Sequence, residues 1–441
     1  MSIGRWPQQA AFLAGLLMVA GTLPTVAQEW TGFRGPHGNG LVESITHPLE
    51  WGSDSNMAWS VELPGGGLSS PVTHEGRVFV TTAVGFEPPV GFAQGVRDMR
   101  PKLPDGPLQF QVICLDLKDG SQLWSTTIAD HQPEHPIHRS NSFATESPTT
   151  DGERLYVYFA SAGVLAALDF DGNELWRQDP GSYPAGNGFG PGSSLVCGNG
   201  KVYLQCDNDE ESFVAAYDGK TGQPLWRQSR EGRTSWATPM LWKNDRRTEL
   251  ITCGSGFVTS YDPDSGDILW TIDNVSSAFS ASPASDSGRI YFGNSGPRSS
   301  GPLLAVDNEM TGSSSFDPDQ SEGNVTWSRM RAGPGMASPI CSSGLLYVPG
   351  RGILTCYDAS DGTEQFKERI DTGSVVASLW GDQERIFLLD EDGKTTVLEV
   401  GPELKVIGEN RIEDDTFWST PAIAGDALLI RGSNRLYCIR K

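Results

Sequence analysis

The chain has 441 residues, and its formal net charge of −22 at pH 7 makes it strongly acidic. A surface with this charge repels nucleic acid and anionic lipid, which are themselves negatively charged, so we expect neither as a partner. The length alone would ordinarily suggest two or more domains, but a repeat of short strands fills almost the whole chain.

Residues 1–27 have the layout of a secretory signal peptide. They contain one positive charge at Arg5, an apolar run over residues 10–20, and the small-residue sequence Thr25-Val26-Ala27. A membrane anchor is the alternative interpretation, but the apolar run is short for a hydrocarbon layer of about 30 Å. We therefore expect export to the periplasm, the cell envelope or the medium, with no membrane insertion after cleavage.

Residues 28–56 precede the repeat and form a separate N-terminal arm. The stretch from Trp30 to Gly40 contains several glycines and Pro36, which exclude a helix. The arm is not low in sequence complexity, so we expect it to dock against the domain that follows.

Residues 145–176 are the clearest copy of a repeat of four short strands. Ser147-Pro148 opens the first strand, Leu155–Phe159 is the second, Leu165–Leu168 is the third, and Trp176 lies in the fourth. Gly-containing turns separate these strands. A single four-stranded meander cannot bury both of its faces, so each copy needs neighbours to pack against.

Eight copies of this unit follow one another. The intervals between their opening positions are 77, 47, 44, 44, 56, 40 and 42 residues, in or near the range of a propeller blade except for the first, which insertions lengthen. The copies open at Pro71, Pro148, Leu195, Pro239, Pro283, Pro339, Leu379 and Pro421. Six of them carry an aromatic residue in the fourth strand: Trp124, Trp176, Trp226, Trp270, Trp327 and Phe366.

The two ends of the chain predict how the ring closes. The eighth copy stops after its third strand, Leu436–Ile439, and has no fourth strand of its own. Residues 57–63 match a fourth strand and lie ahead of the first copy. A strand from the N-terminus that completes the last blade removes two open sheet edges. The sequence therefore predicts an all-β, eight-bladed β-propeller over residues 57–441, closed by an N-terminal strand.

Seven cysteines in an exported chain would ordinarily suggest disulfides. Cys114, Cys356 and Cys438, however, share the third-strand slot that other copies fill with Ala or Ser. This shared slot favours buried thiols, which behave as small apolar residues, and the odd number of cysteines points the same way. Disulfides are the alternative.

The sequence Ala216–Trp226 resembles the docking motif Ala-x-Asp-x-x-Thr-Gly-x-x-x-Trp of the pyrroloquinoline quinone (PQQ) repeat propellers, and Cys114–Trp124 and Ser260–Trp270 are close variants. The resemblance covers residues 57–441 and implies a quinoprotein alcohol dehydrogenase-like fold in which each Trp packs against the next blade. This family includes quinoprotein dehydrogenases and noncatalytic propellers such as the outer-membrane protein assembly factor BamB. With its arm, the chain also resembles exported bacterial PQQ-like repeat proteins without an assigned reaction.

A fold-level resemblance does not by itself imply a reaction. The dehydrogenases of the family use a disulfide between adjacent cysteines against the quinone and Glu, Asn and Asp ligands for calcium, whereas no two cysteines are adjacent here. We therefore expect a noncatalytic binding or interaction scaffold of the cell envelope, with no cofactor. A quinoprotein-type oxidoreductase that binds PQQ and calcium at an atypical site is the alternative.

Other motifs that suggest metal chemistry are weak. His131, His135 and His138 are spaced by four and three residues, but two prolines between them break any helix that would align them. The sequence Asp390-Glu391-Asp392-Gly393 partly mimics a calcium loop, yet it lies in a strand-turn-strand segment. We expect no metal site.

The two faces of a propeller carry different connections. We call the face that bears the fourth-to-first and second-to-third connections the loop-rich face, because the long segments 83–109, 127–144, 179–192, 228–235, 295–301 and 328–336 fall there. Binding commonly uses long loops on a rigid scaffold. We predict a cationic sector on this face that binds a protein, a peptide or an acidic glycan; solvated loops with chance charge are the alternative. Its members are Arg230, Arg233, Arg298, Arg329, Arg331 and Arg351.

The channel side of the same face adds further candidates. Two positions before the opening residue, seven copies have Ser or Ala, whereas the second copy has Glu146. A salt bridge from Glu146 to Arg139 or His138 is the structural interpretation, because buried carboxylates are normally paired. Trp236 and Trp418 lie one residue earlier in their copies and are expected to form the floor of a ligand site or to plug the channel. The oligomeric state does not follow from the sequence.

Overall fold

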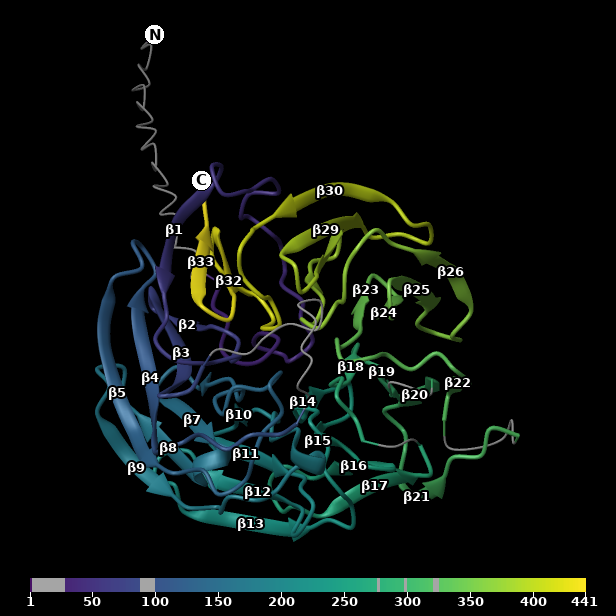
Figure 1. Cartoon of the computed structure of the whole chain (residues 1–441). Helices are drawn as coiled ribbons and strands as arrows, with labels where there is room; N and C mark the ends of the chain where they lie inside the picture. Colours follow the sequence, from purple (N-terminus) through teal and green to yellow (C-terminus); the bar gives the residue numbers. More distant parts are fainter. Residues whose placement is uncertain (2–27, 88–99, 276–277, 297–299, 320–324) are drawn as a thin grey trace.

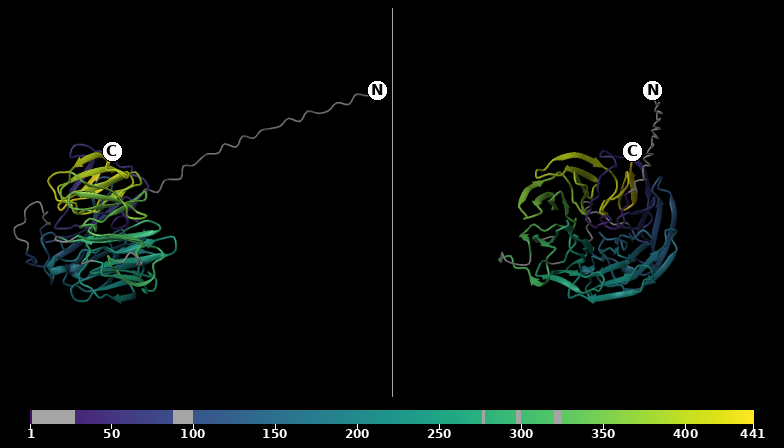
Figure 2. Two further views of the ribbon diagram at one scale, coloured as in Figure 1. Left: turned by 90° about the vertical axis from the view of Figure 1, so that its right-hand side faces the viewer. Right: turned by 180° about the vertical axis from the view of Figure 1, so that it is seen from behind.

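The computed structural model describes Met1 and residues 28–441 apart from 88–99, 276–277, 297–299 and 320–324. In this part of the chain, eight sheets surround one axis, so the predicted eight-bladed β-propeller is confirmed (Figure 1). Figure 2 shows the ring from the side and from behind. The predicted signal peptide, except for Met1, lies outside the described residues.

Blades 1 to 4 each run in chain order from an inner to an outer strand. Blade 1 consists of β2 (Val72–His74), β3 (Arg77–Val84), β4 (Leu108–Asp116) and β5 (Gln122–His131). Blade 2 consists of β6 (Thr149–Thr150), β7 (Leu155–Phe159), β8 (Val164–Leu168) and β9 (Glu174–Gln178), with the short helix η2 (Ala160–Ala162) between β7 and β8. Blade 3, preceded by η3 (Gly186–Gly188), consists of β10 (Val196–Gly198), β11 (Lys201–Cys206), β12 (Phe213–Asp218) and β13 (Pro224–Ser229). Blade 4 consists of β14 (Met240–Lys243), β15 (Thr248–Gly254), β16 (Phe257–Tyr261) and β17 (Ile268–Asp273).

Blades 5 to 8 complete the ring. Blade 5 consists of β18 (Ala284–Ser285), β19 (Arg289–Ser295), β20 (Ser300–Asp307) and β22 (Trp327–Arg329). Blade 6 consists of β23 (Ile340–Ser342), β24 (Leu345–Pro349), β25 (Ile353–Asp358) and β26 (Glu364–Arg369). Blade 7 consists of β27 (Trp380–Gly381), β28 (Arg385–Leu389), β29 (Lys394–Glu399) and β30 (Val406–Arg411). Blade 8 consists of β31 (Ala422–Ala424), β32 (Ala427–Arg431), β33 (Arg435–Ile439) and a strand from the other end of the chain.

That strand is β1 (Met57–Glu62), which pairs antiparallel with β33 (Figure 1). Ser60 lies opposite Tyr437, and an ion pair of 2.9 Å joins Arg435 to Glu62 at the end of the ladder. Because the first and last strands of the propeller share one sheet, the ring closes without an open edge between them. The predicted closure by an N-terminal strand is confirmed.

Successive blades are joined by tryptophans of the fourth strands. The indole N–H of Trp176 donates to the carbonyl oxygen of Gly219 in the next blade at 2.9 Å. The same bond, at 2.9–3.2 Å, joins Trp59 to Leu117, Trp124 to Phe170, Trp226 to Pro263 and Trp327 to Ala359. The packing role that the family resemblance implies for these tryptophans is thus present in the structure.

The small third-strand residues lie directly opposite the fourth-strand aromatic residues. Cys114 pairs with Trp124, Ala167 with Trp176, and Cys356 with Phe366. A small side chain in this slot leaves room for the large ring beside it. All seven cysteines are free thiols, as predicted. Burial raises the pKa of Cys114 to about 12, so this thiol is a packing residue and not a reactive one.

The junction of blades 4 and 5 departs from the repeat. The inserted segment before β22 forms β21 (Gly312–Ser315), which pairs in parallel with β17 and adds a fifth strand to blade 4. The indole of Trp270 in β17 does not bind the next blade but donates to Glu249 at 2.8 Å. Glu249 is fully buried and also accepts hydrogen bonds from Asn244, Arg247 and Ser260, so its charge is compensated.

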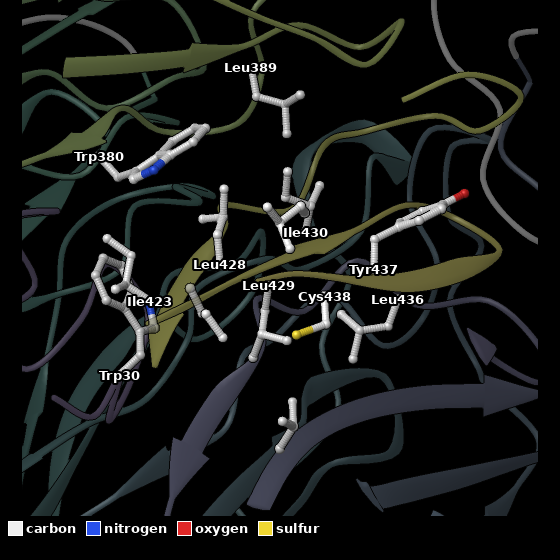
Figure 3. Close-up of a cluster of buried hydrophobic side chains, with 14 of the residues drawn as sticks. Trp30, Trp380, Leu389, Ile423, Leu428, Leu429, Ile430, Leu436, Tyr437 and Cys438 are labelled. Atoms are coloured by element: carbon white, nitrogen blue, oxygen red, sulfur yellow. The ribbon is translucent and has the colours of Figure 1, made fainter. Parts of the chain in front are cut away.

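The N-terminal arm belongs to the hydrophobic core. Trp30 is fully buried and packs in one cluster with residues of blades 7 and 8, including Trp380 and Ile423 (Figure 3). Farther along the arm, Trp51 stacks on Phe387 of blade 7 with ring centroids 6.4 Å apart. The arm is therefore an integral part of the fold and not a linker. Among the described residues, no helix has the length and apolar composition needed to span a membrane.

Candidate functional site

A ring of hydroxyl side chains holds the inner strands around the channel. In every copy, the residue before the opening position is Ser or Thr: Ser70, Ser147, Ser194, Thr238, Ser282, Ser338, Ser378 and Thr420. Seven hydrogen bonds of 2.9–3.2 Å link them, each from a backbone N–H to the hydroxyl oxygen of the next blade. Seven backbone N–H groups at the edges of the inner strands thereby gain a hydrogen-bond acceptor, and neighbouring inner strands are held together around the channel. The sequence shows this hydroxyl slot in all eight copies, although its role became evident only in the structure.

The arm closes the channel at the face opposite the loop-rich one, which we call the turn face. Thr31 accepts a hydrogen bond from the backbone of Thr150 in blade 2, and Gly40 accepts one from Gly381 in blade 7. Between these anchors, the guanidinium of Arg34 donates to carbonyl oxygens of two further blades, at Pro283 (2.7 Å) and Pro339 (2.5 Å). Arg34 is fully buried, and this burial lowers its pKa to about 9. One channel end is thus filled by the chain itself.

The other channel end forms a mouth on the loop-rich face. Its rim consists of the residues three positions before each opening residue: Leu68, Thr145, Gly192, Trp236, Ser280, Met336, Val376 and Trp418. Trp236 and Trp418 lie on opposite sides of the mouth, because four blades separate them in a ring of eight. Both are half-buried, whereas Met336 is 41% exposed. The rim is therefore largely apolar.

Each rim tryptophan donates a hydrogen bond to a loop of the same face. The loop is the connection between blades 2 and 3 for Trp236 and the second-to-third connection of blade 7 for Trp418. The indole N–H of Trp236 donates to the carbonyl oxygen of Gly190 at 2.7 Å, and its ring lies edge-on to Phe189 with centroids 6.2 Å apart. Phe189 is 46% exposed and packs on His138 from its other side. The indole of Trp418 donates to Glu391 at 3.1 Å. The prediction that these tryptophans lie at the mouth agrees with their positions, and their ligand role stays a prediction.

Glu146 lies in the channel wall but does not form the expected salt bridge. It is 1% exposed, and among the described residues neither carboxyl oxygen has a hydrogen-bond partner. No ion pair joins it to Arg139 or His138 in this part of the chain; His138 instead bonds Ser140 at 2.6 Å. Burial raises the pKa of Glu146 to about 8, against the opposing effect of nearby backbone amides. The salt-bridge interpretation is therefore wrong, because the wall buries this carboxyl away from both candidate cations.

The predicted cationic sector is smaller than expected. Arg230 is buried in an ion pair with Asp207, at 2.7 Å, and also donates to Thr252 and Tyr261. It joins blades 3 and 4 and is not available at the surface, so the expectation of an exposed group there is wrong. The reason is that Asp207, at the end of β11, supplies a buried partner that the loop assignment could not show.

Arg329 is also placed differently. It belongs to β22 and not to a loop, and its guanidinium donates to the carbonyl oxygen of Asp361 in a third-to-fourth turn, which lies on the turn face. Arg298 lies outside the described residues. Arg233, Arg331 and Arg351 are exposed. The predicted acid-binding surface therefore rests on these three side chains.

A cavity of about 20 Å³ lies between blades 2 and 3 on the loop-rich side. Its lining includes Tyr158, Ala185, Ser193, Gln205, Asp207 and Ser235. This volume is enough for one water-sized group. Sequence reasoning missed Gln205, because no motif surrounds it in β11, and Asp207, because it reads as part of a polar turn after this strand. The available signal was a polar amide within the otherwise apolar run Val202–Cys206.

Comparison with known proteins identifies the family of this repeat. Residues 108–238 and 314–402 match a family model described as outer membrane protein assembly factor BamB. The chain belongs to the PQQ-like repeat β-propeller family. A curated relative of this PQQ-like propeller, the outer membrane protein assembly factor BamB of Moranella endobia (strain PCIT), is 25% identical over 257 residues. The match covers 53% of this chain and 61% of that protein, so the chain spans about three fifths of the relative's length.

Solved structures share the propeller fold. The crystal structure of BamB from Moraxella catarrhalis has a TM-score of 0.57 at 12% identity and covers 87% of this chain and 97% of that chain. The quinohemoprotein alcohol dehydrogenase from Comamonas testosteroni has a TM-score of 0.62 at 12% identity and covers 93% of this chain and 80% of that chain. At these identities the likeness shows the fold alone.

The quinone that gives the repeat its name would need a larger cavity than the one between blades 2 and 3. Pockets for ligands of that size measure about 300–1,000 Å³, whereas the cavity in the described part of the channel wall measures about 20 Å³. Arg34 and Arg431, the buried guanidinium groups at the channel, already donate to backbone oxygens of neighbouring strands. Among the described residues, no three His, Cys, Asp or Glu side chains are grouped to hold a metal ion.

Proposed function

We propose that the protein is a noncatalytic binding scaffold of the cell envelope that uses the channel mouth on its loop-rich face to hold a protein partner. The observation that carries the proposal is the asymmetry of the channel: the arm fills the turn-face end with Arg34, whereas the opposite end presents a half-exposed apolar rim. Exposed apolar surface on a rigid scaffold is typical of protein-binding sites. The names of the relatives, which are outer membrane protein assembly factors, support an envelope setting and a protein partner.

The exposed arginines would contribute at the edge of this site. Arg233 and Arg331 lie in the connections of the loop-rich face, and guanidinium groups bind carboxylates in a bidentate manner. Acidic segments of a protein or peptide partner, or an acidic glycan, would meet them there. Their contribution would weaken with salt, because exposed charges are screened beyond about 8 Å at physiological ionic strength.

We propose no cofactor for this function. The alternative, a quinoprotein-type oxidoreductase, requires uptake of PQQ with calcium and alcohol- or sugar-dependent reduction of a dye acceptor. Absorbance spectra of the purified protein with and without added PQQ and calcium test this alternative directly. Stoichiometric uptake with dye reduction would overturn the scaffold assignment.

Site-specific photo-crosslinking in the cell envelope tests the mouth as the binding site. A photoreactive amino acid is placed at Met336 or at Phe189, both of which are exposed on the loop-rich side. The matched control is Ile268, which is 59% exposed at the start of β17 in blade 4. We expect the two mouth positions to crosslink to the same envelope protein and Ile268 not to do so. Equal crosslinking from Ile268, or none from the mouth, would contradict the proposal.

A further inference from the structure

The cavity between blades 2 and 3 contains a hydrogen-bond acceptor with no donor. Gln205 is 1% exposed and lines the cavity. Its amide nitrogen donates to Asp207 at 2.8 Å and to the carbonyl oxygen of Cys253 at 2.9 Å. Because both of these partners are acceptors, the amide cannot be reversed, and its oxygen must point away from them. Among the described residues, that oxygen has no partner.

Glu146 adds a second buried acceptor close by, one that has no side-chain donor among the described residues. Its two buried carboxyl oxygens lack partners in the described part of the chain. Backbone amides that act on this carboxyl include that of Ala160, and Ala160 lines the cavity. Burial raises the pKa of Tyr158, another lining residue, and the nearby Cys206 and Glu146 act in the same direction. Glu146 is therefore adjacent to the cavity wall formed by Tyr158 and Ala160.

The cavity wall also contains a carboxylate whose charge is already paired. Asp207 lines the cavity, and its ion pair with Arg230 is directed into the junction of blades 3 and 4, where Arg230 also bonds Thr252. The whole chain carries a formal net charge of −22, which attracts cations over long range. Buried polar atoms without partners are rare in native proteins and cost free energy, so they often mark an absent ligand or water. Here the amide oxygen of Gln205 and the ionised form of Glu146 both lack a donor.

We propose that this cavity is a subsite for a basic side chain of the protein partner, and that the terminal ammonium of a lysine enters it to donate to Gln205 and Glu146. The inference rests on the proposed function, because it specifies which group of a partner bound at the mouth is recognised. The cavity volume of about 20 Å³ admits a terminal ammonium but not a larger ligand. Gly192 and Ser193, which line the cavity, continue directly from the rim into the channel wall, so the cavity borders the mouth.

Saturation-transfer NMR with matched peptides tests the subsite on the full mature chain. The probes are acetyl-Ser-X-Ser-amide peptides in which X is lysine, norleucine or glutamate, so that only the end of one side chain differs. We expect saturation of the lysine peptide, strongest at its ε-methylene group, and none of the other two. Equal saturation of the lysine and norleucine peptides would overturn the proposal, because the aliphatic stem and not the ammonium would then be recognised.

Two variants of different kinds keep the test independent of folding defects. Glu146→Gln removes the ionisable carboxyl group, and Ala185→Leu fills the cavity while leaving both acceptors in place. We expect each to weaken binding of the lysine peptide at least tenfold. If unfolding midpoints show that both variants are folded and binding is unchanged, the subsite is wrong. If crosslinking from the mouth persists in both variants, the scaffold function is unaffected by that result. If instead the wild-type protein binds the peptide but gives no crosslinks from the mouth, only the proposed function is overturned.

Discussion

Gly222 lies directly against the indole of Trp176 in the preceding blade, and a Cβ added to Gly222 would lie 2.6 Å from the ring. The glycine also has a left-handed backbone, with φ of +72°. The same contact recurs between Gly120 and Trp59 and between Gly172 and Trp124. The Thr-Gly turn and the tryptophan of the repeat are therefore two halves of one interblade contact.

This contact predicts the effect of Gly222→Ala. Forcing a non-glycine residue into the left-handed region costs about 1–2 kcal/mol, and crowding a packed ring costs about 1–3 kcal/mol more. We expect Gly222→Ala to lower the free energy of unfolding by the sum of the two, as measured by denaturant titration. Gly312→Ala is the matched control: Gly312 has the same φ of +72°, but a Cβ there meets nothing within 4 Å. Equal losses in the two variants would show that the tryptophan contact contributes nothing.

A second prediction concerns the buried ion pair. Removing one member of such a pair leaves a buried charge without a partner, which typically costs about 3–5 kcal/mol. We expect Arg230→Met to destabilise the protein by this amount, because Asp207 is also fully buried. Arg233→Met, at an exposed position three residues away, should change the stability by less than about 0.5 kcal/mol. Similar thermal midpoints for the two variants would contradict the structural assignment of Arg230.

The sequence was sufficient for the ring because its signals are local and repeated. The prediction of strands β7 and β8, of the interval between copies and of a fourth strand at residues 57–63 depends on local composition and spacing. The departure from the repeat at blade 4 could not be predicted from such local signals. There, Trp270 binds Glu249 and β21 adds to β17, and both contacts depend on tertiary packing of an insertion whose sequence has no strong pattern.

The functional side chains were harder to place because a loop position does not reveal whether a charge is paired. Arg230 and Arg233 are three residues apart in one predicted loop, yet one is buried by Asp207 and the other is exposed. The arm shows a related limit: its sequence suggested docking, but not that Arg34 reaches carbonyl groups in blades 5 and 6. For this reason we expect deletion of residues 28–50 to destabilise the ring strongly, which a lower midpoint of thermal unfolding would show.

The pH dependence of stability should report on the arm. His47 packs between Trp51 and Phe387, and burial lowers its pKa from the usual 6.5 to about 4. The unfolded chain therefore binds a proton below pH 6.5 that the folded chain does not bind until about pH 4, so stability falls as the pH falls through this window. The full loss is roughly 3 kcal/mol. We expect His47→Phe to remove this pH-dependent loss of stability. The free energy of unfolding of the variant minus that of the wild type should therefore increase from pH 7 to pH 4. A difference that stays constant over this range would contradict the role of His47.

Glu146 should show the opposite sign. Its pKa is raised from 4.5 to about 8 by burial, so above pH 4.5 the unfolded chain releases a proton that the folded chain retains. Stability therefore falls as the pH rises from 4.5 to 8, by roughly 5 kcal/mol in total from this one group. Glu146→Gln removes the titration but leaves a buried amide without partners, so its stability at any single pH is not diagnostic. The informative quantity is the difference between variant and wild type, which should shift in favour of the variant from pH 5 to pH 8. Addition of the lysine peptide should reduce this shift, because a bound ammonium stabilises the ionised carboxylate in the folded state. A shift that the peptide leaves unchanged would place Glu146 in the channel wall as a structural residue only.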